Sequence, residues 1–189
     1  SYEENIGFSL PKRIAYDICP VNIVLNYLAE KIGYEFDHNG DFAQSGNVSN
    51  KVLNELNKLS FFNFPPPKSL GLEWVKKYVF PILEESNISI NDQLCTYTEH
   101  IAFQLSKQFN KNSKVLVTGG GAFNLYLLKR INSFKHLKLL IPSNTLVEYK
   151  EALIFGFLGV LRLRDENNCL SSVTGAKKNH SSGTVFKIK

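Results

Sequence analysis

Three consecutive glycines, Gly119-Gly120-Gly121, follow a short apolar run and constrain the fold more than any other segment of the chain. The run at 114–118 predicts a buried strand, and the apolar spacing within 125–131 predicts a helix directly after the glycines. A second strand is expected at 137–141 and a second helix at 148–164. This β-α-β-α order is typical of an α/β layer with parallel strands.

The glycine run favours a nucleotide-binding loop on local grounds. Glycines carry no Cβ that would obstruct a ligand, and the helix that follows offers unpaired N–H groups at its first turn. A tight strand-to-helix turn that binds nothing explains the same residues equally well. The spacing matches neither the dinucleotide fingerprint G-x-G-x-x-G nor a P-loop, because no Gly-Lys-Ser/Thr follows Gly121.

The first half of the chain is expected to be mostly helical. Pro20 suits the first turn of one helix and Gly33 suits its end. Asn91 or Asp92 is expected to cap a later helix, and Pro81 is expected to kink or end the helix before it. Apolar residues with helical spacing predict helices at 21–32, 48–59, 69–83 and 91–109.

The late helix at 148–164 is apolar nearly all round, which predicts a buried element. Glu151 lies within it. A charge there must be paired or face a polar cavity, since burying it alone is costly. Alternatively, Glu151 occupies an exposed first turn, where the helix dipole favours acids. The tail after Asn167 is expected to be rich in loops and to end in a strand at 184–188.

Asp17 follows a β-compatible segment at 13–16 and precedes a helix. Carboxylates at the ends of strands commonly point into a cleft in α/β proteins. There Asp17 could take a proton from water or a hydroxyl, although a turn or capping role suits the position as well. The three prolines at 65–67 predict a rigid loop that presents Lys68 and Ser69, either to a substrate or simply at the surface.

Composition and charge narrow the classes of partner. The net charge is +5, but the basic residues are scattered and form no basic-aromatic motif of the kind that nucleic-acid-binding proteins use. No segment approaches the roughly 20 apolar residues of a membrane span. We therefore expect neither partner. The three cysteines match no disulfide or zinc spacing, and the histidines match no ligand spacing, so we expect a reducing cytoplasm and no protein-held metal.

Several segments together resemble the anhydro-N-acetylmuramic acid kinase family, in the order in which that family has them. The resemblance implies a ribonuclease H-like α/β core of the actin/hexokinase/Hsp70 superfamily, with a mixed sheet and packed helices. It also implies that residues 1–189 form a single domain, the C-terminal half of the kinase, and that the N-terminal phosphate-loop domain lies outside this chain. The segments are 16–22, 36–46, 65–71, 117–124, 151–152 and 172–176.

The same resemblance implies a reaction. The kinase would use ATP and Mg²⁺ to phosphorylate 1,6-anhydro-N-acetylmuramic acid with hydrolytic opening of its anhydro ring, giving N-acetylmuramic acid 6-phosphate in cell-wall recycling. It further suggests a homodimer. Asp17 matches the family's catalytic base. The other matched positions are Asn22, Lys68, Ser69 and Glu151 on the sugar side and Gly119, Gly120, Gly121 and Asn124 on the nucleotide side.

Two positions depart from the family pattern. Cys19 and Val21 replace the two glycines that flank the proline, and these larger side chains are expected to narrow the space beside Asp17. The alternatives are therefore a domain that binds nucleotide or sugar without turnover, or an inactive relative of the kinase. Without the phosphate loop, the 189-residue chain alone is expected to be inactive.

Overall fold

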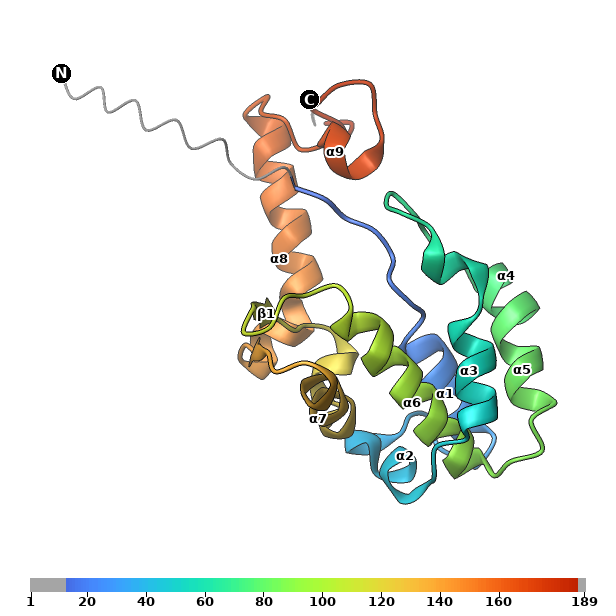
Figure 1. Cartoon of the computed structure of the whole chain (residues 1–189). Helices are drawn as coiled ribbons and strands as arrows, with labels where there is room; N and C mark the ends of the chain where they lie inside the picture. The colour runs from blue at the N-terminus through green and yellow to red at the C-terminus, as the bar shows by residue number, and fades with distance from the viewer. Residues whose placement is uncertain (1–12, 187–189) are drawn as a thin grey trace.

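The computed structural model describes residues 13–186 (Figure 1). A body of short helices surrounds one long helix, and the part of the chain after that helix carries a small sheet and a second long helix. The helices are α1 (Asn22–Glu30), α2 (Asp41–Ser45), α3 (Asn50–Asn57), α4 (Leu72–Trp74), α5 (Phe80–Glu84), α6 (Ile90–Ser106), α7 (Leu125–Phe134), α8 (Asn144–Leu163) and α9 (Ser171–Thr174), and the strands are β1 (Lys114–Leu116) and β2 (Lys138–Leu140).

Helix α6 forms the centre of the core. Leu94, Tyr97 and Ile101 are completely buried, because α1, α2, α3 and α7 pack around the helix (Figure 1). The expected cap is wrong: Ser89 caps α6, and its hydroxyl accepts a hydrogen bond of 3.1 Å from the backbone N–H of Asp92. Serine is as good a cap as aspartate or asparagine, so apolar spacing alone misplaced the helix start by about two residues.

The sheet confirms the expected parallel pairing. Strands β1 and β2 run parallel, with Val115 opposite Leu139. Within residues 13–186 the sheet has only these two strands and no antiparallel partner, so the expected mixed sheet is not seen there. The strand expected at 13–16 is also wrong, because this segment has no neighbouring strand with which to form a ladder. Residues 184–186 form no strand either, and the rest of that expected strand lies outside the described residues.

Pro81 neither ends its helix nor kinks it sharply. Helical residues run from Leu72 to Glu84, and a π-helical turn at Val75–Val79 precedes the proline. Proline has no N–H to donate and crowds the preceding turn, and a wider π turn relieves both constraints. The helix therefore continues through Pro81 to Glu84, with a local change in helix type before the proline.

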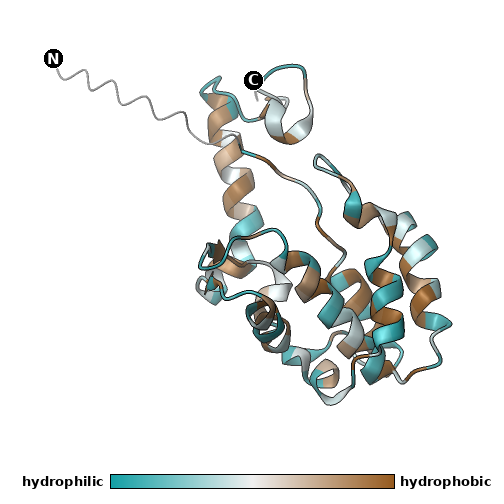
Figure 2. Cartoon of the chain, viewed as in Figure 1, coloured by the Kyte–Doolittle hydropathy of each residue, from teal (hydrophilic) through white to brown (hydrophobic). Residues whose placement is uncertain are grey.

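Helix α8 contradicts the expectation that it is buried. It is 20 residues long, and only Val147 is buried in it. Figure 2 shows apolar residues along its length, while Figure 1 shows it standing apart from the helical body. The apolar pattern was identified correctly, but no other element among residues 13–186 covers most of its surface. None of the described helices combines the length and apolarity that a membrane span requires.

Candidate functional site

Asp17 lies against the triple-proline loop. Its backbone N–H donates a hydrogen bond of 3.0 Å to the carbonyl of Lys68, and its Oδ2 accepts one of 2.7 Å from the backbone N–H of Leu70. The segment before α1 is thereby anchored to a loop that lies about 50 positions further along the chain. Among the described residues, none bonds to Oδ1, so this oxygen is available to another partner.

The same contacts form one wall of a cavity of about 580 Å³. Lys68 and Ser69 line it beside Asp17, and Val173 and Thr174 close it from the α9 side. The structure thus brings together three segments that resemble one family: 16–22, 65–71 and 172–176. Asp17 and Ser69 remain exposed to solvent in this cavity.

The Lys68 ammonium group turns back onto its own loop. Its Nζ donates a hydrogen bond of 3.1 Å to the carbonyl of Phe61 and lies 4.6 Å from the centre of the Phe61 ring. Partial burial, together with the positive charge of Lys107, lowers the Lys68 pKa. Lys68 therefore contributes positive charge at the cavity wall, while its present contacts are with the protein.

Cys19 and Val21 do not narrow the Asp17 cavity, contrary to expectation. Neither residue lines it. Cys19 packs against the hydrophobic core, where burial raises the pKa of its thiol to about 12. Cys19 is therefore a neutral packing residue at physiological pH rather than a nucleophile. Val21 lines a separate cavity beside the glycine loop.

The glycine loop joins β1 to α7. Gly119 adopts the left-handed region with φ of +74°, and the residues Gly120–Phe123 form a 3₁₀ turn. Asn124 then caps α7, since its Oδ1 accepts a hydrogen bond of 2.8 Å from the backbone N–H of Leu127. Asn124, which was assigned to the nucleotide side, therefore already uses its only side-chain oxygen to hold the helix.

Asn22 lies at this glycine loop and not at the Asp17 cavity. A Cβ added at Gly120 would lie only 2.7 Å from Nδ2 of Asn22, so glycine permits the close approach of α1 to the loop. The family resemblance had assigned both Asn22 and Lys68 to the sugar-binding side of the site. The structure groups it with the glycines instead, because it lines the two cavities on either side of Gly120.

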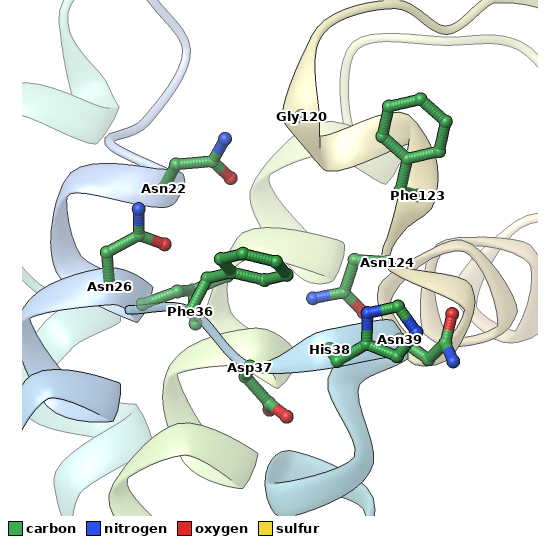
Figure 3. A pocket seen from close by; sticks show the side chains of 10 residues that line it. Asn22, Asn26, Phe36, Asp37, His38, Asn39, Gly120, Phe123 and Asn124 are labelled. Atoms are coloured by element: carbon green, nitrogen blue, oxygen red, sulfur yellow. The ribbon is translucent and has the colours of Figure 1, made fainter. Parts of the chain in front are cut away.

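The smaller of these two cavities, about 240 Å³, combines aromatic rings with amide groups (Figure 3). Asn22 and Asn26 project from α1, Phe123 comes from the glycine loop, and the Phe36 ring reaches the middle of the opening. The Phe36 and Phe123 side chains are 51% and 41% exposed. Apolar rings and a few convergent amides are the usual components of a pocket for a small planar ligand.

Sequence reasoning missed Phe36 and Phe123 as site residues. Phe36 was recognised only as part of the 36–46 segment, in which His38 and Asn39 also line this pocket. Asp37 turns away from the pocket (Figure 3) and accepts hydrogen bonds of 2.9 Å from the N–H groups of Phe42 and Ala43 at the start of α2. One sequence signal could have identified both phenylalanines as site residues. Each directly precedes a residue whose side chain accepts hydrogen bonds at the start of a helix, Asp37 after Phe36 and Asn124 after Phe123.

Glu151 is exposed on α8 and lines none of the cavities described above, so the structure does not bring it together with Asp17 or the glycine loop. Its neighbour Lys150 does reach the loop, where its Nζ donates a hydrogen bond of 3.1 Å to Oγ1 of Thr118. Glu151 is exposed, as the second interpretation expected, but α8 begins at Asn144, so Glu151 lies beyond the first turn that this interpretation assigned to it.

A partly buried ion pair holds α7, and with it the end of the glycine loop, against α6. Arg130 Nε and Nη2 donate hydrogen bonds of 2.6 and 2.7 Å to the two carboxylate oxygens of Glu99. This bidentate geometry fixes the orientation of both side chains. The Glu99 carboxylate raises the pKa of Arg130 further. Neither residue had been identified from the sequence.

Residues 13–186 contain no cluster of three or more His, Cys, Asp or Glu side chains that could hold a metal ion. Mg²⁺ commonly binds one or two carboxylates together with substrate phosphates and water. The carboxylates of the described residues are therefore compatible with a Mg²⁺ ion that is coordinated mainly by nucleotide phosphates and water.

Comparison with known protein families gives a match to the model described as anhydro-N-acetylmuramic acid kinase, over residues 4–188. Curated relatives carry the same name. The protein from Pasteurella multocida is 32% identical over 198 aligned residues, which cover 96% of this chain and 52% of the relative. The protein from Sulfurovum sp. is 30% identical over 182 residues, with 92% and 50% covered.

The protein of that name from Haemophilus influenzae is 30% identical, with 96% of this chain and 54% of the relative covered. The chain therefore spans about half the length of the curated relatives that it matches.

Proposed function

The chain belongs to the anhydro-N-acetylmuramic acid kinase family. We propose that it carries the catalytic carboxylate of such a kinase and the part of the nucleotide site that binds the purine. The observation that carries this proposal is the Asp17 carboxylate, held by the Leu70 N–H in a cavity formed by three of the family-like segments. We propose a ribonuclease H-like core for the whole protein, of which the two parallel strands would be one part.

In the proposed reaction Asp17 acts as general base. Its free oxygen, Oδ1, would take a proton from the water that attacks the anomeric carbon of 1,6-anhydro-N-acetylmuramic acid. The bond from that carbon to O6 breaks, and O6 accepts the γ-phosphoryl group of ATP, which leaves ADP and N-acetylmuramic acid 6-phosphate. The Leu70 N–H holds the Asp17 carboxylate in one orientation, which lowers the entropy cost of orienting this group during the reaction. Lys68 and Ser69 would line the sugar's binding site.

The glycine loop and the pocket of Figure 3 would hold the nucleotide. The backbone at Gly119 has open space beside it, and the backbone at Gly121 has only a van der Waals neighbour, Val21. A ribose or phosphate group could therefore approach both closely. The rings of Phe36 and Phe123 would flank the purine, since base–aromatic stacking is tolerant of geometry and contributes about 1–3 kcal/mol per base. Asn22 and Asn26 would supply amide hydrogen bonds to its edge.

Mg²⁺ would neutralise charge on the transferring phosphoryl group when bound. This chain offers no set of acidic side chains to hold it within residues 13–186, so the proposal leaves the ion on the nucleotide phosphates. Use of ATP would place the reaction in the cytoplasm, where its product could enter cell-wall recycling. A homodimer, which the resemblance suggested, stays a proposal.

Product formation is the direct test. A chimera that joins this chain to the unmatched half of the Pasteurella multocida relative should convert 1,6-anhydro-N-acetylmuramic acid, ATP and water to a product whose mass increases by one phosphoryl group and one water. Mass spectrometry of the product distinguishes this from simple ATP hydrolysis. A folded chimera that binds ATP but forms no such product would contradict the proposed function.

The exposure of Asp17 supports a second candidate for the 189-residue chain by itself. An open carboxylate does not exclude bulk water from the reacting atoms, as phosphoryl transfer requires. The chain alone would then bind nucleotide without turnover. Calorimetry with ATP should give measurable heat, while the product assay on the same sample should remain negative.

A further inference from the structure

The most unusual surface of the molecule is one face of α8. Six apolar side chains lie on it at intervals of three or four residues, the spacing that places side chains in one row along a helix. Leu153 and Phe157, at its centre, are each 61% exposed. We call this row the α8 stripe: Leu146, Tyr149, Leu153, Phe157, Val160 and Leu163.

A second bare surface adjoins the start of α8. One face of the two-stranded sheet presents Leu116 and Leu140, which pair across the strands and are 64% and 50% exposed. Figure 1 shows β1 beside α8, and the hydrogen bond between Lys150 and Thr118 ties that part of the helix to the end of β1. Parallel sheets are normally covered on both faces. Among the described residues only one face is covered, because Val115 and Leu139 pack against the core whereas Leu116 and Leu140 do not.

These surfaces are too apolar to be ordinary solvent-facing structure. Scattered apolar residues are normal on a protein surface, but contiguous rows of large ones mark an interface. A bilayer is a poor occupant, because Glu148, Lys150 and Glu151 interrupt the apolar run and the helix does not meet the requirements of a membrane span. A protein partner is the remaining class.

Length identifies the partner. The curated relatives of this chain are about twice as long as the part it matches. A two-stranded parallel sheet with a bare face and an uncovered 20-residue helix is what remains when a larger α/β layer is divided. We propose that the α8 stripe and the bare face of β1 and β2 form the docking surface for the half of the kinase that lies outside this match, whether it belongs to the same polypeptide or to another.

The proposal concerns assembly and does not depend on catalysis. Docking at α8 would also bring the second half next to the glycine loop, because Lys150 links the helix to Thr118 at the start of that loop. The open nucleotide pocket would then acquire its missing wall.

The test mixes the 189-residue chain with the unmatched half of the Pasteurella multocida relative and measures mass by light scattering and affinity by biolayer interferometry. We expect a one-to-one complex. Leu153→Asp and Phe157→Asp should each weaken it at least tenfold, because each places a charge in the stripe. Phe155→Asp is the matched control: Phe155 is 71% exposed on the other side of the same helix, so the complex should keep its affinity.

Two readouts separate the outcomes. Amide hydrogen exchange should slow along α8 in the complex, and circular dichroism should show that the Asp variants remain folded, since the substituted side chains are exposed. The proposal is overturned if no complex forms, if stripe and control variants bind alike, or if the chain forms a dimer that Phe157→Asp dissociates. The last result would make a second copy of this chain the occupant. Failure of the product assay alone would leave this proposal standing.

Discussion

The backbone N–H of Leu70 donates a hydrogen bond of 2.7 Å to Oδ2 of Asp17, across 53 positions of sequence. This contact positions the one carboxylate that the proposed reaction needs. It also explains why a stiff proline loop follows α3: a flexible loop would hold the N–H donor less firmly, and ordering it would cost more entropy.

Asp17→Asn should abolish most phosphoryl transfer while leaving the fold unchanged. The asparagine side chain keeps an oxygen that can accept from Leu70 but is no longer a base. General base catalysis contributes about 10²–10⁴ in rate, so we expect a loss of that size in the chimera's turnover. Asp41→Asn, at an exposed acid in the first turn of α2, is the control and should retain full activity. Equal activity in both variants would remove Asp17 from the mechanism.

Gly120→Ala should weaken nucleotide binding by about tenfold, or roughly 1.4 kcal/mol. The new Cβ would lie 2.7 Å from Asn22 Nδ2 and would push that amide out of the pocket wall. Gly156→Ala is the control, because Gly156 lies in α8 outside the pocket and its new Cβ would meet nothing within 4 Å. Titration of the chain with a fluorescent ATP analogue checks both. A loss in the Gly156 variant as large as that in the Gly120 variant would contradict the steric explanation.

Phe36→Ala should reduce the affinity for ATP by about tenfold, because a base–aromatic contact contributes about 1–3 kcal/mol. The effect should disappear when inorganic triphosphate replaces ATP, since no base is then present. Phe64→Ala is the control: Phe64 is similarly exposed, at 56%, but does not line the pocket. Equal losses for ATP and triphosphate would argue against stacking at Phe36.

Arg130→Met should destabilise the protein by roughly 1–2 kcal/mol. Glu99 has a side chain that is only 10% exposed and would lose both of its hydrogen bonds, but the 32% exposure of Arg130 limits the cost through solvent screening. Urea unfolding measures the difference. Arg164→Met, which removes the solvent-exposed pair with Glu166, should change the unfolding free energy by much less. Similar losses in both variants would show that the Arg130–Glu99 pair contributes no more to the free energy of unfolding than the exposed pair does.

Stability should fall in mild acid because of His100. This side chain is completely buried, and burial, with a smaller contribution from Lys107, lowers its pKa from 6.5 to about 3. Below pH 6.5 the unfolded chain therefore binds a proton that the folded chain does not. The free energy of unfolding should decrease by about 1.4 kcal/mol per pH unit as the pH falls from 6.5 toward 3.

His100→Gln should flatten this part of the stability profile, measured by urea unfolding between pH 7 and pH 4. Glutamine can still bond to Asn57, the present partner of the His100 ring at 2.8 Å, but it does not titrate. His136→Gln, at an exposed histidine, should keep the slope of the unmodified protein. An unchanged slope in the His100 variant would assign the acid sensitivity to other groups.

The sequence by itself determined the family, the main helices and the two paired strands, but not the strands expected at 13–16 and 184–188. The apolar period of α1 places Val24, Leu25 and Leu28 on the buried face, and the apolar runs before and after α7 predict the two parallel strands. Such patterns are legible because helix and strand periods are fixed by backbone geometry, whatever the rest of the protein does.

Only the tertiary structure decided what each element contacts. Periodicity showed that α8 is apolar but could not show that nothing among residues 13–186 covers it. Spacing likewise could not place Asn22 beside Gly120, nor join Asp17 to Leu70, because these contacts connect segments far apart in sequence. Apolar character is a property of the residues, whereas burial and hydrogen-bond partners depend on which distant surfaces the folded chain brings together.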